Sequence, residues 1–279
     1  MLTDKEWMDR CRAEGSNDMT VISFSAVYIW RSIFGLTVDG DERFYVIKSI
    51  SDEGYYYPVG RKDACRDWVR SMLSDGQPLK FVYVPKGELE WLESIGFETS
   101  YEPDTSEYVY SSRSMALLDN GAGSNYRSKI HNFSRDNEWS VEAFDFPADE
   151  EFLRRMIRSW ADEPSSRRVP DRQAVLACAE NPARAGLSGI HIETDTGEWA
   201  FLLGYPSTKE IYDMTIVKYS PWISRNVVPV CFCELSKLVC NDFPYINLED
   251  DMGVSGLRTM KSLYHPLFLL DSYTARIGF

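Results

Sequence analysis

Three carboxylates and two cations lie close together in a stretch near the end of the chain. The carboxylates are Glu249, Asp250 and Asp251, and Arg258 and Lys261 follow them. In acyl transfer to an amine, a carboxylate can accept the proton and a cation can stabilise the developing oxyanion. We expect Asp250 or Asp251 to fill the first role and Arg258 or Lys261 the second. A solvated acidic loop between an ordinary strand and helix is the alternative interpretation.

A strand and a helix must position these groups. An apolar run over residues 243–247 predicts a short strand ending at Asn247, whose side chain could hold a substrate carbonyl or amide. A helix is expected from Leu257, with apolar residues at 3.6-residue spacing on one face. That face consists of Leu257, Met260, Leu263, Tyr264 and Leu267. Lys261 lies on its flank, and Tyr264 is a further candidate for contact with substrate.

A second candidate cluster lies on a helix expected over residues 124–137. Its members are Tyr126, Arg127, Lys129 and His131. Arg127 and His131 are four residues apart and therefore neighbours on a helix, so together they could bind a phosphate or a carboxylate. A solvated helix face is the simpler explanation of the same spacing.

A third candidate is Asp213, in a strand expected over residues 211–219. Asp213 and Thr215 alternate and should lie on one face of that strand. Asp213 could contact the substrate through its carboxylate. A buried, hydrogen-bonded Asp–Thr pair would explain the pattern as well.

The pattern N-x-E-D-D-x-G-x-x-G-L-R-x-x-K-x-x-Y-x-P over residues 247–266 resembles the signature of the phosphatidylglycerol lysyltransferase C-terminal domain family. The segments FSAVYIWRSIFG (24–35), YYYPVG (55–60) and NYRSKIHNF (125–133) extend the likeness over nearly the whole chain. Members of that family contain two GNAT-type acyltransferase domains in tandem. The resemblance therefore implies an α+β fold of two tandem GNAT-like domains, each a mixed, mostly antiparallel sheet flanked by helices.

The length and the polar connection over residues 102–107 fit two domains. We predict an N-terminal GNAT-like domain over residues 1–111, completed by a strand at 108–111. The C-terminal domain, residues 112–279, would carry the active site. Its strands at 187–193, 199–205 and 211–219 come before a helix at 227–240 and a further strand, which is the GNAT order that the resemblance implies.

The loop that binds the acyl donor departs from the acetyltransferase pattern. GNAT-type acetyltransferases hold the pyrophosphate of acetyl-CoA on the backbone N–H groups of a glycine-rich loop at a helix start. The corresponding stretch here keeps Arg225 but has Val227, Val228 and Pro229 where glycines are needed. Acetyl-CoA is therefore a disfavoured donor. The resemblance implies aminoacyl-tRNA instead, and Arg225 is a candidate contact with the donor.

Composition and charge exclude several classes. A net charge of -13 argues against a binder of duplex DNA, which would present a basic face. The chain contains no apolar run long enough to span a membrane and no secretory signal, so we expect a cytoplasmic protein. The six cysteines form no CxxC pair and the three histidines are scattered, which disfavours a metal site or a disulfide framework.

The function that we expect is transfer of an acyl or aminoacyl group, with aminoacyl-tRNA as a possible donor, to an amine or hydroxyl. A lipid acceptor is disfavoured because the membrane helices that accompany the lysyltransferases are absent from this sequence, which resembles a soluble, stand-alone, bacterial-type member. One alternative is a non-catalytic GNAT-like module that binds a ligand or a protein. A second is an acetyl-CoA-dependent N-acetyltransferase. The sequence does not define the oligomeric state.

Overall fold

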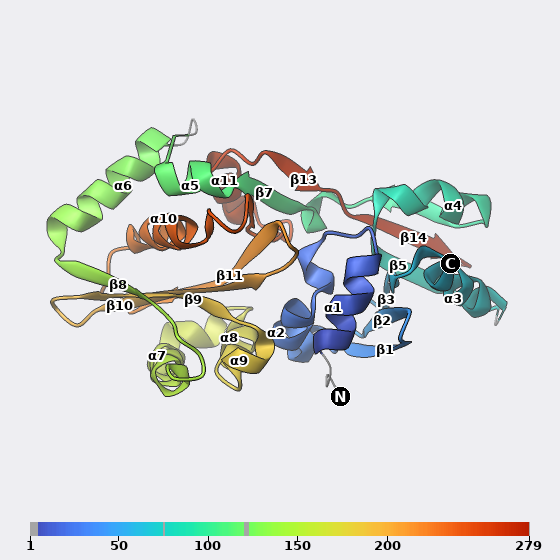
Figure 1. Ribbon diagram of the computed structural model, residues 1–279, viewed down its shortest axis with the longest axis horizontal. Coiled ribbons are helices and arrows are strands. Elements are labelled where there is room, and N and C mark those ends of the chain that lie inside the picture. The colour runs from blue at the N-terminus through green and yellow to red at the C-terminus, as the bar shows by residue number, and fades with distance from the viewer. Residues whose placement is uncertain (1–4, 75, 120–122, 279) are drawn as a thin grey trace. The chain divides into compact units, whose positions relative to one another are not determined.

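The computed structural model describes residues 5–74, 76–119 and 123–278 (Figure 1). The chain forms two compact units, each with its own sheet. The first unit comprises Met1–Glu107, Asp250–Gly253 and Leu270–Phe279. The second comprises Tyr108–Glu249 and Val254–Leu269.

The described residues of the first unit contain a mixed seven-stranded sheet in the order β1-β2-β3-β5-β14-β6, with β4 paired to β2. The strands are β1 (Thr37–Asp41), β2 (Phe44–Ser49), β3 (Gly54–Tyr56), β4 (Val59–Gly60), β5 (Leu79–Val84), β6 (Glu98–Tyr101) and β14 (Tyr273–Ile277). The helices are α1 (Lys5–Glu14), α2 (Phe24–Phe34), α3 (Lys62–Ser74) and α4 (Leu89–Ser94), with 3-10 turns η1 (Thr20–Ile22), η2 (Lys86–Glu88) and η3 (Pro103–Thr105). β3 and β5 are parallel, and the other pairs are antiparallel.

Helices cover both faces of this sheet, and the side chains of β2 point alternately to one face and the other. Tyr45 faces α1, where its ring lies 6.0 Å from that of Trp7. Phe44 faces α3, with its ring 6.3 Å from that of Trp68. Successive side chains of a strand point to opposite faces, so a strand with apolar residues at both parities is buried on both. β2 is accordingly buried at every position except Lys48.

The described residues of the second unit contain a seven-stranded sheet in the order β13-β7-β12-β11-β10-β9-β8. The strands are β7 (Glu107–Ser111), β8 (Trp139–Ala143), β9 (Ser188–Thr194), β10 (Trp199–Pro206), β11 (Ile211–Tyr219), β12 (Tyr245–Asn247) and β13 (Phe268–Leu270). The helices are α5 (Ser112–Leu117), α6 (Gly123–Asp136), α7 (Glu150–Asp162), α8 (Arg172–Cys178), α9 (Pro182–Ala185), α10 (Val227–Val239) and α11 (Ser255–Leu263), with a 3-10 turn η4 (Pro164–Arg168). β11 and β12 are parallel, whereas β8 to β11 are antiparallel.

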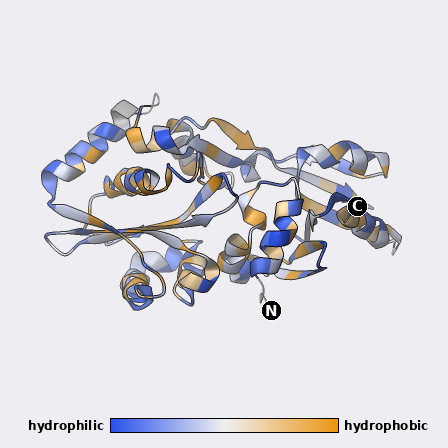
Figure 2. Cartoon of the chain, in the orientation of Figure 1, coloured by the Kyte–Doolittle hydropathy of each residue, from blue (hydrophilic) through white to orange (hydrophobic). Residues whose placement is uncertain are grey.

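Helices cover both faces of this second sheet. α10 and α6 lie on one face, and α7, α8 and α9 lie on the other (Figure 1). α10 is largely hydrophobic (Figure 2) and buries most of its residues against β9, β10 and β11. The apolar run of β10 is buried from Ala200 to Tyr205, so this strand is covered on both faces of the sheet.

The α+β class is confirmed, but one predicted strand joins a different sheet from the expected one, and a strand that was not predicted completes the first sheet. β7, expected to complete the first domain, instead pairs with β12 in the second sheet. β14, near the chain's end, lies between β5 and β6 in the first sheet. The first unit is therefore discontinuous in sequence, and the domain limits 1–111 and 112–279 stay a prediction.

The expected apolar face of α11 is wrong at two positions. Leu263 and Leu267 are 44% and 58% exposed, whereas Lys261 is only 6% exposed. α11 ends at Leu263, so Leu267 lies beyond the helix and helical spacing no longer fixes its direction. In the described part of the chain, no helix combines the length and apolar character that a membrane crossing requires.

Candidate functional site

A row of buried polar residues crosses three adjacent strands of the second unit. Tyr205 on β10 pairs with Asp213 on β11, and Asp213 pairs with Asn247 on β12. Directly opposed residues in a sheet have Cβ atoms about 5 Å apart. Asp213 and Asn247, two of the residues singled out in the sequence, are thus neighbours and both fully buried.

A second contact continues this row past the end of β12. The amide side chain of Asn247 accepts a hydrogen bond from the backbone N–H of Glu249 (2.7 Å). Thr215 Oγ1 donates to Glu249 Oε1 over 2.8 Å. Glu249 has a φ of +62°, a left-handed conformation that a non-glycine residue adopts only when its surroundings hold it there. Asn247 and Thr215 supply that support.

β11 departs from plain alternation next to this row. The register with β10 shifts between Leu203 and Gly204, which leaves Thr215 as the extra residue of a bulge between Met214 and Ile216. A bulge bends its strand and redirects the side chains around it. The expected Asp213–Thr215 pair is thus separated by the bulge, and the hydroxyl of Thr215 bonds to Glu249.

Lys261 is a buried cation that fixes the backbone beyond β12. Its Nζ donates to the carbonyl of Leu248 over 2.6 Å and lies 5.9 Å from the ring centre of Tyr108. The carbonyl of Lys261 itself accepts from the hydroxyl of Tyr110 (2.9 Å). α11 is therefore tied at Lys261 to β7 and to the residue that follows β12.

Two candidate tyrosines stack on each other. The rings of Tyr126 and Tyr264 lie 3.8 Å apart and 11° from parallel. Tyr126 Oη donates to the carbonyl of Met260 (3.4 Å). Burial raises the pKa of Tyr264 well above its ordinary value and also raises that of Tyr126. Both therefore stay neutral near pH 7, where they can donate hydrogen bonds but not act as bases.

The two aspartates expected to accept a proton belong to the first unit. Asp250 Oδ1 accepts from the N–H of Met252 (3.0 Å), and Asp251 Oδ1 accepts from the N–H of Gly253 (2.9 Å). Asp251 is fully buried and Asp250 half-buried. Burial, together with the carboxylates of Asp52 and Asp250, raises the pKa of Tyr56 above its ordinary value. Arg258 and Lys261 belong to the second unit, so their convergence with the aspartates stays a prediction.

The remaining candidates lie at the surface of the second unit. Arg127 donates to the carbonyl of Leu118 (2.6 Å), and Lys129 Nζ lies 5.0 Å from the ring of Tyr126. The side chains of His131, Arg225 and Arg258 are exposed. Of the candidate residues on α6, only Tyr126 is buried, where it stacks on Tyr264. The expectation that Arg127 and His131 bind one anion together stays a prediction.

The start of α10 is closed by its own loop. The N–H of Val227 donates to the carbonyl of Ser224 (2.9 Å), and that of Val228 donates to the carbonyl of Arg225 (3.2 Å). Pro229 has no N–H. Three of the first positions of the helix therefore have no N–H free for a ligand, although such groups are the usual anion cradle.

Three residues of this region were given no role by sequence reasoning. Tyr205 sits within an apolar run, Tyr110 in an unremarkable strand, and Glu249 in a turn that the sequence alone makes look solvated. Asn247 and Glu249 have the spacing of an Asx-type turn, in which the Asn side chain bonds to the N–H two residues later. Only this spacing could have indicated that Glu249 has a fixed position. In the residues that the structure describes, no three His, Cys, Asp or Glu side chains are arranged to hold a metal ion.

The second unit has four antiparallel strands, then α10, then β12 parallel to β11, which is the order expected of a GNAT-type domain. With two such mixed sheets flanked by helices, the molecule is a tandem GNAT-like protein. Residues 17–276 match the family model "Phosphatidylglycerol lysyltransferase, C-terminal". The chain belongs to that family, whose kind of function is acyl or aminoacyl transfer.

Solved structures share the fold. A conserved protein of unknown function from Bacteroides thetaiotaomicron is similar with a TM-score of 0.84 and 21% identity, over 100% of this chain and 98% of that one. The C-terminal domain of a putative lysylphosphatidylglycerol synthetase from Agrobacterium fabrum has a TM-score of 0.67 and 15% identity, over 97% and 90%. L-PGS from Bacillus licheniformis has a TM-score of 0.64 and 13% identity, over 94% and 87%. No curated protein matches the chain.

Proposed function

We propose that this protein transfers an aminoacyl group from aminoacyl-tRNA to an amine or hydroxyl acceptor. Membership of the family supports the reaction class. The choice of donor rests on one observation at the start of α10. The N–H groups of Val227 and Val228 form hydrogen bonds to carbonyls of the preceding loop, and Pro229 has no N–H group. A pyrophosphate would find no backbone cradle there, so acetyl-CoA is disfavoured as donor.

The reaction requires one bond exchange and the passage of one proton from the acceptor, through a base, to the leaving oxygen. The acceptor nitrogen or oxygen attacks the ester carbonyl of the donor, its new bond to that carbon forms, and the bond to the ribose oxygen breaks. A carboxylate takes the acceptor's proton and then gives that proton to the ribose oxygen as it leaves. Asp250 and Asp251 are the proposed bases, and Lys261 is the proposed cation for the oxyanion.

The other candidates have binding roles in this proposal. Asp213 and Asn247, adjacent in the sheet, would orient the acceptor through carboxylate and amide oxygens. Tyr264, stacked on Tyr126, would form an aromatic wall. The surface cations Arg127, Lys129, Arg225 and Arg258 are proposed to contact donor phosphates, for which they have the appropriate charge. His131, four residues from Arg127 on the same helix, is proposed to donate a hydrogen bond to the same donor.

The test is a transfer assay with two labelled donors. Bulk tRNA charged with a mixture of radiolabelled amino acids, and labelled acetyl-CoA, are each incubated with the protein and a panel of small amines, peptides and phosphatidylglycerol vesicles. We expect the label to move from the tRNA to an amine, peptide or lipid product that can be separated from the tRNA, and no label to be transferred from acetyl-CoA. If label were transferred only from acetyl-CoA and not from the tRNA, the protein would be an acetyl-CoA-dependent N-acetyltransferase instead.

A non-catalytic binding module is the second candidate, and the closed start of α10 favours it as well. Such a module would be stabilised by a ligand without consuming it. If aminoacyl-tRNA raises the melting temperature but the ester is never turned over, the binding module replaces the transferase.

A further inference from the structure

An open groove of about 490 Å³ lies on the first unit, and none of the candidate site residues lines it. Ten residues from three strands and one helix form its walls: Thr37, Asp39, Gly40, Asp41, Phe44, Val46, Lys48, Tyr55, Trp68 and Met72. Pockets of roughly 300–1,000 Å³ accommodate small molecules. The groove is therefore large enough for a metabolite-sized ligand.

The register of β1 and β2 explains why the groove has two different sides. Alternate residues of both strands share its face, and the opposed pairs are Thr37–Lys48, Asp39–Val46 and Asp41–Phe44. β1 is the edge strand and contributes the polar side. Val46 and Phe44, both buried, form the floor.

The opposite side is aromatic. The ring of Trp68 on α3 lies 5.5 Å from that of Tyr55 and 6.3 Å from that of Phe44, and Met72 follows one turn later on the same helix. Such a wall suits an apolar or aromatic side chain, because ring contacts add to the free energy of area burial.

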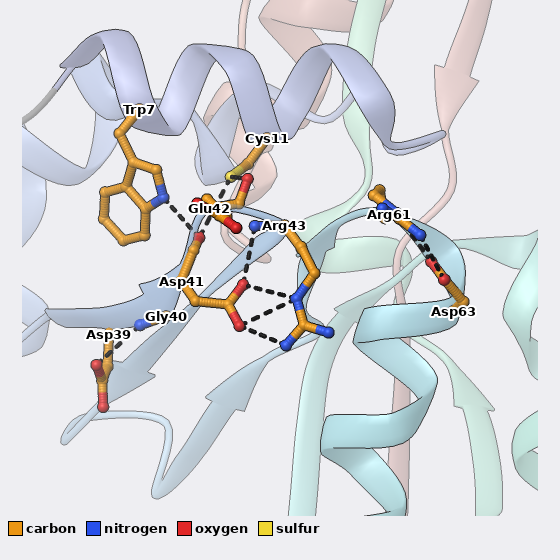
Figure 3. Close-up of polar contacts among 9 residues, drawn as sticks. All are labelled: Trp7, Cys11, Asp39, Gly40, Asp41, Glu42, Arg43, Arg61 and Asp63. Atoms are coloured by element: carbon orange, nitrogen blue, oxygen red, sulfur yellow. Dashed lines mark hydrogen bonds and ion pairs between the residues drawn. The ribbon is translucent and has the colours of Figure 1, made fainter.

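Of the two carboxylates in the groove, one is already neutralised. Arg43 donates from Nε and one terminal nitrogen to Asp41, and these hydrogen bonds lower the pKa of the Asp41 carboxyl (Figure 3). Asp39 differs, because its only dashed contact in Figure 3 is with the N–H of Gly40 (2.8 Å). Among the described residues Asp39 has no cationic partner.

Lys48 supplies the complementary charge. Its Nζ lies 5.8 Å from the ring centre of Tyr55, and it forms no ion pair with any residue that the structure describes. Because Lys48 is opposite Thr37, Asp39 is its diagonal neighbour on the sheet face. Diagonal positions are roughly 7 Å apart, which leaves room for the charged groups of a ligand between the two side chains.

The hairpin that carries Asp39 is anchored from the other face. Trp7 Nε1 donates to the carbonyl of Asp41 (2.7 Å), and the thiol of Cys11 donates to the same carbonyl (3.8 Å). Figure 3 shows both side chains descending from α1 onto this turn. The groove is therefore pre-formed, and a ligand would not have to order it.

We propose that this groove binds a free α-amino acid with an apolar or aromatic side chain. Its ammonium group pairs with Asp39, its carboxylate with Lys48, and its side chain lies against Tyr55, Trp68 and Met72. The complementary pair of charges beside one aromatic wall selects a zwitterion over an ion of either sign. This site does not rest on the proposed transferase function.

Calorimetry on the full chain with L-phenylalanine tests the proposal. For a ligand of this size we expect a Kd on the order of 0.1–1 mM. Phenylalanine amide lacks the carboxylate and N-acetylphenylalanine lacks the ammonium, so each should bind about tenfold more weakly.

Two variants assign the charges. Asp39→Asn should weaken phenylalanine about tenfold but leave N-acetylphenylalanine unchanged, and Lys48→Met should weaken phenylalanine about tenfold but leave its amide unchanged. Glu42→Gln and Lys86→Met, which change exposed charges outside the groove, are the matched controls and should bind as the unmodified chain does.

Absence of heat with about 10 mM phenylalanine, tenfold above the expected range, would overturn the proposal. It would equally fail if the amide alone bound, which would indicate a site for cations, or if neither variant changed the affinity. None of these outcomes bears on transfer from aminoacyl-tRNA.

Discussion

Lys261 illustrates how much one buried side chain can hold in place. Its ammonium group satisfies the carbonyl of Leu248, next to the strained Glu249. Replacement by Met keeps the apolar stem and removes the donor. A charged hydrogen bond of this kind contributes about 1.5–3 kcal/mol, so Lys261→Met should lower the free energy of unfolding by that amount.

Urea unfolding of the variant measures this loss. Lys237→Met, at an exposed lysine of α10 that forms an ion pair with Glu234, is the control and should change stability by less than about 0.5 kcal/mol. A Lys261→Met protein as stable as the control would show that the bond to Leu248 is dispensable.

Glu88 should make the stability of the first unit depend on pH. It is buried, which by itself would raise its pKa, but hydrogen bonds from Arg66, Lys62 and Tyr57 outweigh burial and lower the pKa from its ordinary 4.5. The folded chain therefore holds fewer protons here than the unfolded chain. The contribution is complete above about pH 4.5 and is lost as the pH falls through the lower folded-state value.

Glu88→Gln tests the sign of this effect. At pH 7 we expect a loss of stability on the order of 2–3 kcal/mol, because the half-buried Arg66 and the buried Tyr57 lose a charged partner. The difference between the two proteins should shrink as melts are repeated below pH 4.5. A difference that grows on acidification would contradict the assignment.

At the scale of elements, the β10–β11 pair depends on one glycine. A Cβ at Gly204 would lie 2.1 Å from the carbonyl oxygen of Asp213, at the bulge. Backbone cannot move aside cheaply, so Gly204→Ala should cost about 3 kcal/mol and disturb the position of Asp213.

Gly256 provides the matched control for that substitution. It lies in α11, where an added Cβ would meet nothing within 4 Å outside the helix's own backbone, so Gly256→Ala should stabilise by about 0.5–1 kcal/mol. Thermal unfolding of both variants decides the matter, since equal effects at the two glycines would mean that the bulge tolerates a side chain.

At the scale of the whole molecule, the first unit needs the end of the chain. β14 lies between β5 and β6, and its removal would leave both strands with an unpaired edge. A chain that stops at Leu269 should lose the cooperative unfolding of the first unit and become prone to aggregation. The second unit contains all strands of its own sheet before that point, apart from the last residue of β13, and should retain its transition.

Hydrogen exchange resolved by peptide distinguishes the two units in such a truncated chain. Peptides of β2 and β5 should lose their protection, while those of β10 and α10 should keep it. A chain that stops at Ile277, the last residue of β14, is the control. Uniform loss of protection would show instead that the units fold as one.

Local pattern determined much of this protein. The strand β10 and the helix α10 could be assigned from their own apolar residues, because a segment that is buried must be apolar on its buried faces. The pattern from Asn247 to Pro266 indicated the family, and through it the two mixed sheets. The missing glycines at Val227 and Val228 indicated the closed donor loop. All of these are properties of neighbours in sequence.

Only the tertiary structure decided which strands pair and which side chains are buried. β7 lies in the second sheet instead of the first, because a strand's sequence gives its period but not its partner. β14, where no strand was expected, lies in the first sheet. The partly exposed strands β1, β6 and β13 lack an apolar alternation, so the sequence does not predict them. Lys261 is buried because the carbonyl of Leu248, thirteen residues earlier, satisfies it, and no local pattern encodes such a contact.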